Sequence, residues 1–141
     1  MADFQNFTFK NVSVIAGILE LEGFADVDDV VSITSDAEQF TKTVGAKGDV
    51  TRVQTADNSC TIIVKLLQTS KSNAELNTLY LADVASGAGV FPLMVADIEG
   101  GERYVIPNAW IQKLPDITRG KGVNTMDWTF QGDYLTPIIT G

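Results

Sequence analysis

The chain has 141 residues, of which 45% are hydrophobic and 20% are charged, so it is long and apolar enough to fold as one domain around a core. Its net charge of −8 opposes binding to nucleic-acid phosphates and to anionic membranes. The absence of histidine removes the commonest general base and transition-metal ligand, and a single cysteine, Cys60, excludes a disulfide within the chain.

Short runs bounded by turn residues predict strands along most of the chain. Apolar residues form or alternate along the runs 10–15, 18–22, 30–35, 60–67, 90–98, 103–113 and 126–131, whereas the runs 39–44 and 50–55 are polar. In the second of these runs, Leu19 and Leu21 alternate with Glu20 and Glu22, which is the pattern of a strand with one face toward water. With one predicted helix and no repeat or linker, this order favours antiparallel pairing with a packed helix.

Residues 39–55 predict a hairpin of two polar strands joined by the turn Gly45, Ala46, Lys47, Gly48 and Asp49. The two strands carry few large apolar residues, so the hairpin cannot bury much of itself in a core of its own. We therefore expect it to project from the domain.

The run 60–67 is apolar on both faces, which predicts a central strand covered on both sides and a buried, unreactive Cys60 thiol. A helix is predicted over about 72–85, because Ser72 and Glu75 have the spacing of a capping box. Its apolar stripe is best interpreted as a packing surface: Leu76, Leu79, Tyr80 and Val84.

In the run 103–113, Tyr104, Ile106 and Trp110 alternate as core positions do, and Pro107 predicts an edge or a bulge. In the last run, Trp128 shares its face with two other large apolar residues and is also expected in the core.

No sequence motif predicts a catalytic or metal site. The acidic turn at Asp26, Asp28 and Asp29 lacks the glycine and the distant glutamate of a calcium-binding loop, and a solvated turn is the better interpretation. The glycines do not have the spacing of a phosphate-binding loop. Residues 20–38 contain seven acidic residues and no lysine or arginine, whereas basic residues cluster near residues 113–121. In a ring of subunits, the acidic region of one copy could meet the basic region of the next.

Residues 66–73 lead from a predicted strand into the predicted helix and resemble the same passage in the tail tube proteins of contractile-tailed bacteriophages. Residues 2–4 and 7–12 are similar to the start of these proteins, and residues 113–120 resemble their late loop. The similarity covers most of the chain in order, although none of its motifs consists of catalytic or ligand-binding residues. Residues 135–141 depart from the pattern and receive no role.

The resemblance implies a mainly β, antiparallel β-sandwich or barrel-like subunit forming a single tail-tube domain over 1–141, with a helix at its flank. It further implies that six subunits form a ring and that rings stack into an inner tail tube. The expected partners are the sheath, baseplate and tail terminator proteins, and DNA would pass through without specific binding. We expect a virion structural protein, made in the host bacterial cytoplasm, with no enzyme activity, cofactor, metal or membrane binding.

Three sets of residues are expected to serve assembly in such a tube. Glu20, Glu22 and Asp127 are candidate lumen-facing acids, which would repel DNA. The hairpin turn described above, residues 45–49, is the candidate contact to the next ring. A basic loop is the candidate contact between subunits: Lys113, Arg119 and Lys121.

Two alternatives stay open at this point. The same fold would serve as the tube of a contractile bacteriocin or a type VI-like secretion system. A monomeric β-sandwich that binds a ligand such as a glycan is a different class and would need exposed aromatic residues.

Overall fold

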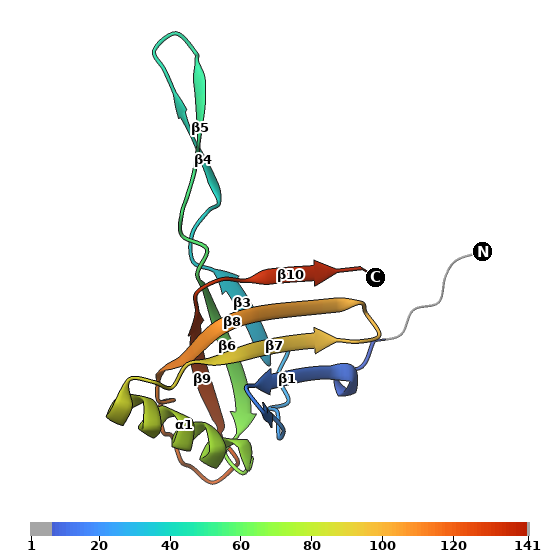
Figure 1. Cartoon of the computed structure of the whole chain (residues 1–141). Coiled ribbons are helices and arrows are strands. Elements are labelled where there is room, and N and C mark those ends of the chain that lie inside the picture. The colour runs from blue at the N-terminus through green and yellow to red at the C-terminus, as the bar shows by residue number, and fades with distance from the viewer. Residues whose placement is uncertain (1–6, 141) are drawn as a thin grey trace, which may run out of the picture.

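The computed structural model describes residues 7–140, which fold into one large antiparallel sheet, a separate hairpin and one α-helix (Figure 1). The resemblance at residues 2–4 lies outside this range. The elements are a 3₁₀ helix η1 (Phe9–Asn11), β1 (Val12–Ala16), β2 (Leu19–Glu20), β3 (Val31–Ser35), β4 (Phe40–Val44), β5 (Val50–Gln54), β6 (Cys60–Leu67), α1 (Ser72–Ser86), β7 (Phe91–Asp97), β8 (Glu102–Lys113), β9 (Thr125–Gly132) and β10 (Thr136–Ile139).

The large sheet has the strand order β2-β1-β7-β8-β9-β6-β3, with β10 paired to β8 beside β9. It folds over on itself, so that β1, β7 and β8 cross β9, β6 and β3 and the two halves enclose a single core (Figure 1). The halves contribute alternate apolar side chains to it, among them Val14, Leu93 and Ile106 from one and Ile62, Val64 and Phe130 from the other. This arrangement confirms the mainly β, sandwich-like or barrel-like fold.

Strand β6 shows how the sequence pattern produces the core. Its residues are alternately buried and half-exposed, and β3 and β9 flank it, which confirms a central strand. The prediction that both faces are covered is wrong, because Ile63 and Lys65 on the outer face stay partly open to solvent. Cys60 is fully buried, and desolvation, followed by the nearby Asp36, raises the pKa of its thiol. The thiol is therefore neutral at physiological pH.

Helix α1 covers one end of the sandwich and contacts β2 and β8 (Figure 1). Its predicted range is confirmed to within one residue, and Gly87 ends it in the left-handed conformation with φ of 71°. The predicted apolar stripe holds at Leu76, which is fully buried, but Val84 is exposed because the last turns extend past the sheet.

The predicted capping box of α1 is wrong. Lys71 occupies the cap position, and Ser72 is the first helical residue. The buried Ser72 hydroxyl instead accepts a hydrogen bond from the backbone N–H of Glu22 at 3.0 Å. Asn73 also holds the helix to the sheet, because its Oδ1 accepts from Trp128 Nε1 at 2.9 Å and its Nδ2 donates to the Leu67 carbonyl at 2.9 Å.

Strand β8 contains the irregularity that Pro107 predicts. Phe91 pairs with Ala109 and Leu93 pairs with Ile106, so the one β7 residue between these pairs faces two residues of β8, and a bulge lies at residues 107–108. The bulge reverses which side chains face the core. Ala109 and Ile111 are buried after it, and the expectation of a core position for Trp110 is wrong, since this side chain is half-exposed.

The first predicted strand begins later than expected. Residues 9–11 form η1, where the Thr8 hydroxyl accepts from the backbone N–H of Lys10 at 3.3 Å, and β1 starts only at Val12. This local cap competes with extension of the strand. The turn presents Phe9 to Phe24, with ring centroids 5.1 Å apart.

Candidate assembly surfaces

The hairpin β4–β5 projects from the body as a two-stranded sheet of its own (Figure 1). All ten residues of its strands are exposed, which confirms the projecting hairpin at 39–55. At its tip, Gly45 donates to the Asp49 carbonyl at 2.7 Å and Gly48 has φ of +93°, a conformation that glycine adopts without strain. An isolated two-stranded sheet is marginal in water, so a partner would stabilise this hairpin.

The two faces of the hairpin differ in chemistry. The register places Lys42 directly opposite Arg52 and Val44 opposite Val50, all on the face that also carries Phe40. The Arg52 guanidinium lies 4.2 Å from the centre of the Phe40 ring. We call this the apolar-cationic face. The opposite face carries mostly threonines: Thr41, Thr43 and Thr51, with Val53.

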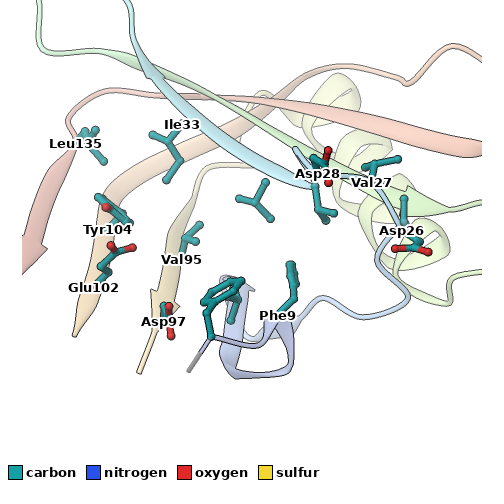
Figure 2. Close-up of a pocket in the computed structure, with 15 residues that line it drawn as sticks. Phe9, Asp26, Val27, Asp28, Ile33, Val95, Asp97, Glu102, Tyr104 and Leu135 are labelled. Atoms are coloured by element: carbon teal, nitrogen blue, oxygen red, sulfur yellow. The ribbon is translucent and has the colours of Figure 1, made fainter. Parts of the chain in front are cut away.

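A groove of about 620 Å³ opens in the body where β3 fails to meet the strands of the other half. Figure 2 shows the segment with Asp26 and Asp28 and strand β3 on one side and strands β7 and β8 on the other, with Phe9 of η1 at one end. Its apolar wall is formed by Phe9, Val31, Ile33, Val95, Tyr104 and Leu135.

Four acids line this groove and no base does. Asp26 and Asp28 come from the acidic turn, and Asp97 and Glu102 come from the facing ends of β7 and β8 (Figure 2). Within residues 7–140 the only salt bridge joins Lys65 to Asp29, so none of the four groove acids has a cationic partner. The groove is therefore apolar inside and negative at its rim.

The predicted basic loop is exposed, but its members are not brought to one point. Lys113 ends β8 and lines a shallow pocket with Asp116, Lys65 and Asp127. Arg119 lies in the following loop and donates to the adjacent Thr118 carbonyl at 2.9 Å.

The third member, Lys121, is also exposed in this loop. Neither Arg119 nor Lys121 forms a salt bridge within residues 7–140, so the loop offers cations to a neighbour.

The predicted lumen acids divide between two parts of the sheet. Glu20 belongs to the two-residue edge strand β2, and Glu22 follows it, both exposed. Asp127 lies on the outer face of β9, directly opposite Lys65 of β6, and is separated from β2 by three strands. The structure therefore brings the two glutamates together and places Asp127 apart from them.

Lys65 is a cation on the outer face of β6 and β9 that interacts with two acids, Asp29 and Asp127. Its Nζ donates to Asp29 Oδ2 at 2.9 Å, and this hydrogen bond lowers the pKa of Asp29 below its ordinary value of 3.8. The same bond raises the pKa of Lys65, to which Asp127 also contributes. Both side chains reach solvent, so the pair is a surface feature.

The described residues include no cluster of three histidine, cysteine or carboxylate side chains that could hold a metal. Across residues 7–140, the helix falls short of the length and apolarity that a membrane span requires. The surfaces with distinctive chemistry are thus the hairpin and the groove.

The chain matches the model of the bacteriophage PhiTE tail tube protein family over residues 4–138. It belongs to this family of phage tail tube proteins. A relative, structural protein ORF10 of Pseudomonas phage KPP10, is 34% identical over 110 residues, which are 77% of this chain and 63% of the relative. The tail tube chain thus spans less than two thirds of that relative's length. The family match confirms the resemblance seen in the sequence.

Three solved structures from contractile injection systems share the fold of this tail tube protein at low sequence identity. The anti-feeding prophage tube-terminating cap has a TM-score of 0.67 at 12% identity, over 99% of this chain and 95% of the cap. An extracellular contractile injection system sheath–tube complex gives 0.60 at 13%, over 92% and 88%. The sheath/tube terminator of that system gives 0.59 at 12%, over 96% and 99%.

Sequence reasoning identified the hairpin but missed the groove. Its walls come from the acidic turn near residue 26 and from strands that begin near residues 91 and 102, which only the folded sheet brings together. The acidic run at residues 20–38 was the one available signal, and it does not show that β3 lacks a neighbour on one side within residues 7–140.

Proposed function

We propose that the chain is a virion structural protein that assembles into hexameric rings, which stack into the inner tail tube through which phage DNA leaves the capsid. The proposal joins membership of the tail tube family to one observation: a hairpin whose strand residues are all exposed and that has no core of its own. Such a segment is best explained by a partner copy. The chain then has no catalytic role, and sheath, baseplate and tail terminator proteins are its other partners.

Assembly would use the open edges of the large sheet. Within residues 7–140, strand β3 pairs only with β6, so five of its residues, Val31–Ser35, present an unpaired edge. At the other edge, β2 is only two residues long and leaves part of β1 open. Pairing between edges of neighbouring subunits would satisfy these backbone groups, and obligate interfaces of this kind bury about 2,000–5,000 Å².

The exposed loop with Lys113, Arg119 and Lys121 is proposed as a contact between subunits of one ring, where it would meet acids of the neighbouring copy. Seven acids lie in residues 20–38, and Asp29 alone among them forms a salt bridge within residues 7–140. The free acids and the exposed bases are therefore available to each other across an interface.

Glu20, Glu22 and Asp127 remain the proposed lumen acids. An acidic wall would remove the counterion-release attraction that makes DNA bind basic surfaces. Asp127 lies on a broad, half-exposed face formed by β6 and β9, whereas the glutamates lie at the sheet edge. Because the two sets lie on different elements, separate substitutions distinguish them.

The test of assembly is negative-stain electron microscopy of the purified chain over rising protein concentration, together with sedimentation velocity. Hollow tubes or six-fold rings support the proposal. Compact monomers at every concentration, also in the presence of baseplate proteins, would contradict it and favour a monomeric ligand-binding module.

The test of the lumen uses phage particles that carry Glu20→Lys with Glu22→Lys, or Asp127→Lys. Tubes should form in both cases, and DNA ejection should slow for the set that faces the passage. Normal ejection from both variants would remove all three acids from the lumen wall. A tube from a bacteriocin or secretion system is the alternative machine, and the phage relative at 34% identity favours the tail.

A further inference from the structure

The groove and the hairpin are complementary surfaces, and neither is covered by other described residues of the same copy. The groove has an apolar wall and four acids at its rim, with no cation among the residues that line it. Like charges along one rim repel each other, so an occupant that brings cations would be attracted to it. An occupant must also bring apolar side chains, because Ile33, Val95 and Tyr104 line the interior.

The apolar-cationic face of the hairpin has this composition. Phe40, Val44 and Val50 are 44%, 56% and 65% exposed, although each is large and apolar. Lys42 and Arg52 stand directly opposite each other on the same face, and like charges at such a position destabilise a strand pair. An acidic partner would offset the repulsion between these two cations. Within residues 7–140 the face therefore lacks an apolar cover, and its two cations share a pocket with a single acid, Glu38. The groove offers an apolar wall and four further acids.

We propose that the groove receives the apolar-cationic face of the hairpin of a second copy, and that this contact joins one ring to the next. The inference rests on the proposed function and adds the receiving surface. The groove occupies the body of the subunit, while the hairpin points away from that body, so the pairing joins two molecules (Figure 1). A volume of about 620 Å³ accommodates a few side chains, as expected for a docked strand face.

The basic loop is the alternative occupant of the groove. The basic loop carries cations too, but Lys113 already lies in a pocket with the acids Asp116 and Asp127. Lys42 and Arg52 likewise line a pocket with Glu38, and in the described part of the chain no acid lies within salt-bridge distance of these two side chains or of Lys113. The hairpin is chosen as occupant because its register places the cations on one face with Phe40, Val44 and Val50, which matches a groove with an apolar wall and acids at its rim.

The experiment exchanges the charges of the two surfaces in the full chain. A hairpin-reversed variant carries Lys42→Glu and Arg52→Glu, and a groove-reversed variant carries Asp28→Lys and Glu102→Lys. A fourfold variant carries all four changes and has the native net charge. The matched control, Glu75→Lys with Glu99→Lys, reverses two exposed acids outside the groove. Thermal unfolding first establishes that each variant folds.

We expect the assembled fraction, measured by sedimentation and microscopy at equal concentration, to fall by about tenfold or more in each reversed variant, because juxtaposed like charges oppose association. The fourfold variant should recover assembly to within about threefold of wild type, and the control should match wild type. Recovery of the groove-reversed variant by Lys113→Glu with Arg119→Glu, in place of the hairpin changes, would overturn the hairpin as occupant.

Two further outcomes separate this inference from the proposed function. If wild type assembles and both reversed variants assemble equally well, the groove pairing is wrong and the tube proposal stands. If wild type stays monomeric under every condition, the tube proposal fails, and the ring-to-ring pairing fails with it.

Discussion

The contact between Asn73 and Trp128 gives the sharpest test of how helix α1 is held to the sheet. Trp128 is 1% exposed, and its indole N–H donates only to Asn73 Oδ1, at 2.9 Å. The same amide donates to the Leu67 carbonyl at 2.9 Å. Asn73→Ala thus leaves a buried N–H unsatisfied, at about 1–3 kcal/mol, and removes a second hydrogen bond worth about 0.5–1.5 kcal/mol.

We therefore expect Asn73→Ala to lower the free energy of unfolding by about 2–4 kcal/mol. The assay is urea unfolding at a concentration where sedimentation shows monomer, so that assembly does not add to the measured stability. The control is Asn77→Ala, an exposed position of the same helix, which should change stability by less than about 0.7 kcal/mol.

A double-mutant cycle with Trp128→Phe isolates the hydrogen bond. Phenylalanine removes the donor, so in that background Asn73→Ala should cost about 1–2 kcal/mol less than in wild type. Equal costs in the two backgrounds, or a loss below about 0.5 kcal/mol in wild type, would refute the idea that this hydrogen bond holds the helix.

Three other predictions follow from the structure. Gly132→Ala should destabilise the chain by about 1–3 kcal/mol in urea unfolding, because an added Cβ would collide with the Ile106 side chain; unchanged stability would contradict this. The difference in stability between wild type and Asp29→Asn should be present above pH 4 and should vanish as pH falls through the lowered pKa of Asp29, because Lys65 favours the ionised form; a difference that persists at pH 2 would have another cause. Deletion of residues 46–49 should leave the unfolding transition of the body intact but prevent stacking of rings, and long tubes from this variant would show that another element joins them.

Local sequence patterns were sufficient for the parts of the fold that depend on near neighbours. The long apolar run at residues 60–67 predicted a central strand, and β6 lies between β3 and β9, although the prediction that both of its faces are covered was wrong. The polar hairpin was predicted because its strands lack a continuous apolar face. The helix was predicted to within one residue from its apolar spacing and from a capping box at Ser72 and Glu75, although Lys71 and not Ser72 occupies the cap position.

Local patterns failed where a distant partner changes the role of a residue. Ser72 fits a helix cap by its spacing, but Glu22, fifty positions earlier, supplies the N–H that its hydroxyl accepts. Trp110 fits a core position by alternation, but the bulge at Pro107 shifts the alternation by one residue. Pro107 predicted an edge or a bulge, but it did not show how many extra residues the bulge would contain.

The sequence by itself determined the fold class and the projecting hairpin, because both depend on the order and periodicity of residues along the chain, and its resemblance to tail tube proteins over most of its length indicated the family. The tertiary structure alone decided that β3 lacks a neighbour on one side and that Asp28 and Glu102 therefore face one groove. Residues so far apart meet only when the sheet folds over on itself, and side-chain periodicity in one strand carries no information about which strand lies across from it.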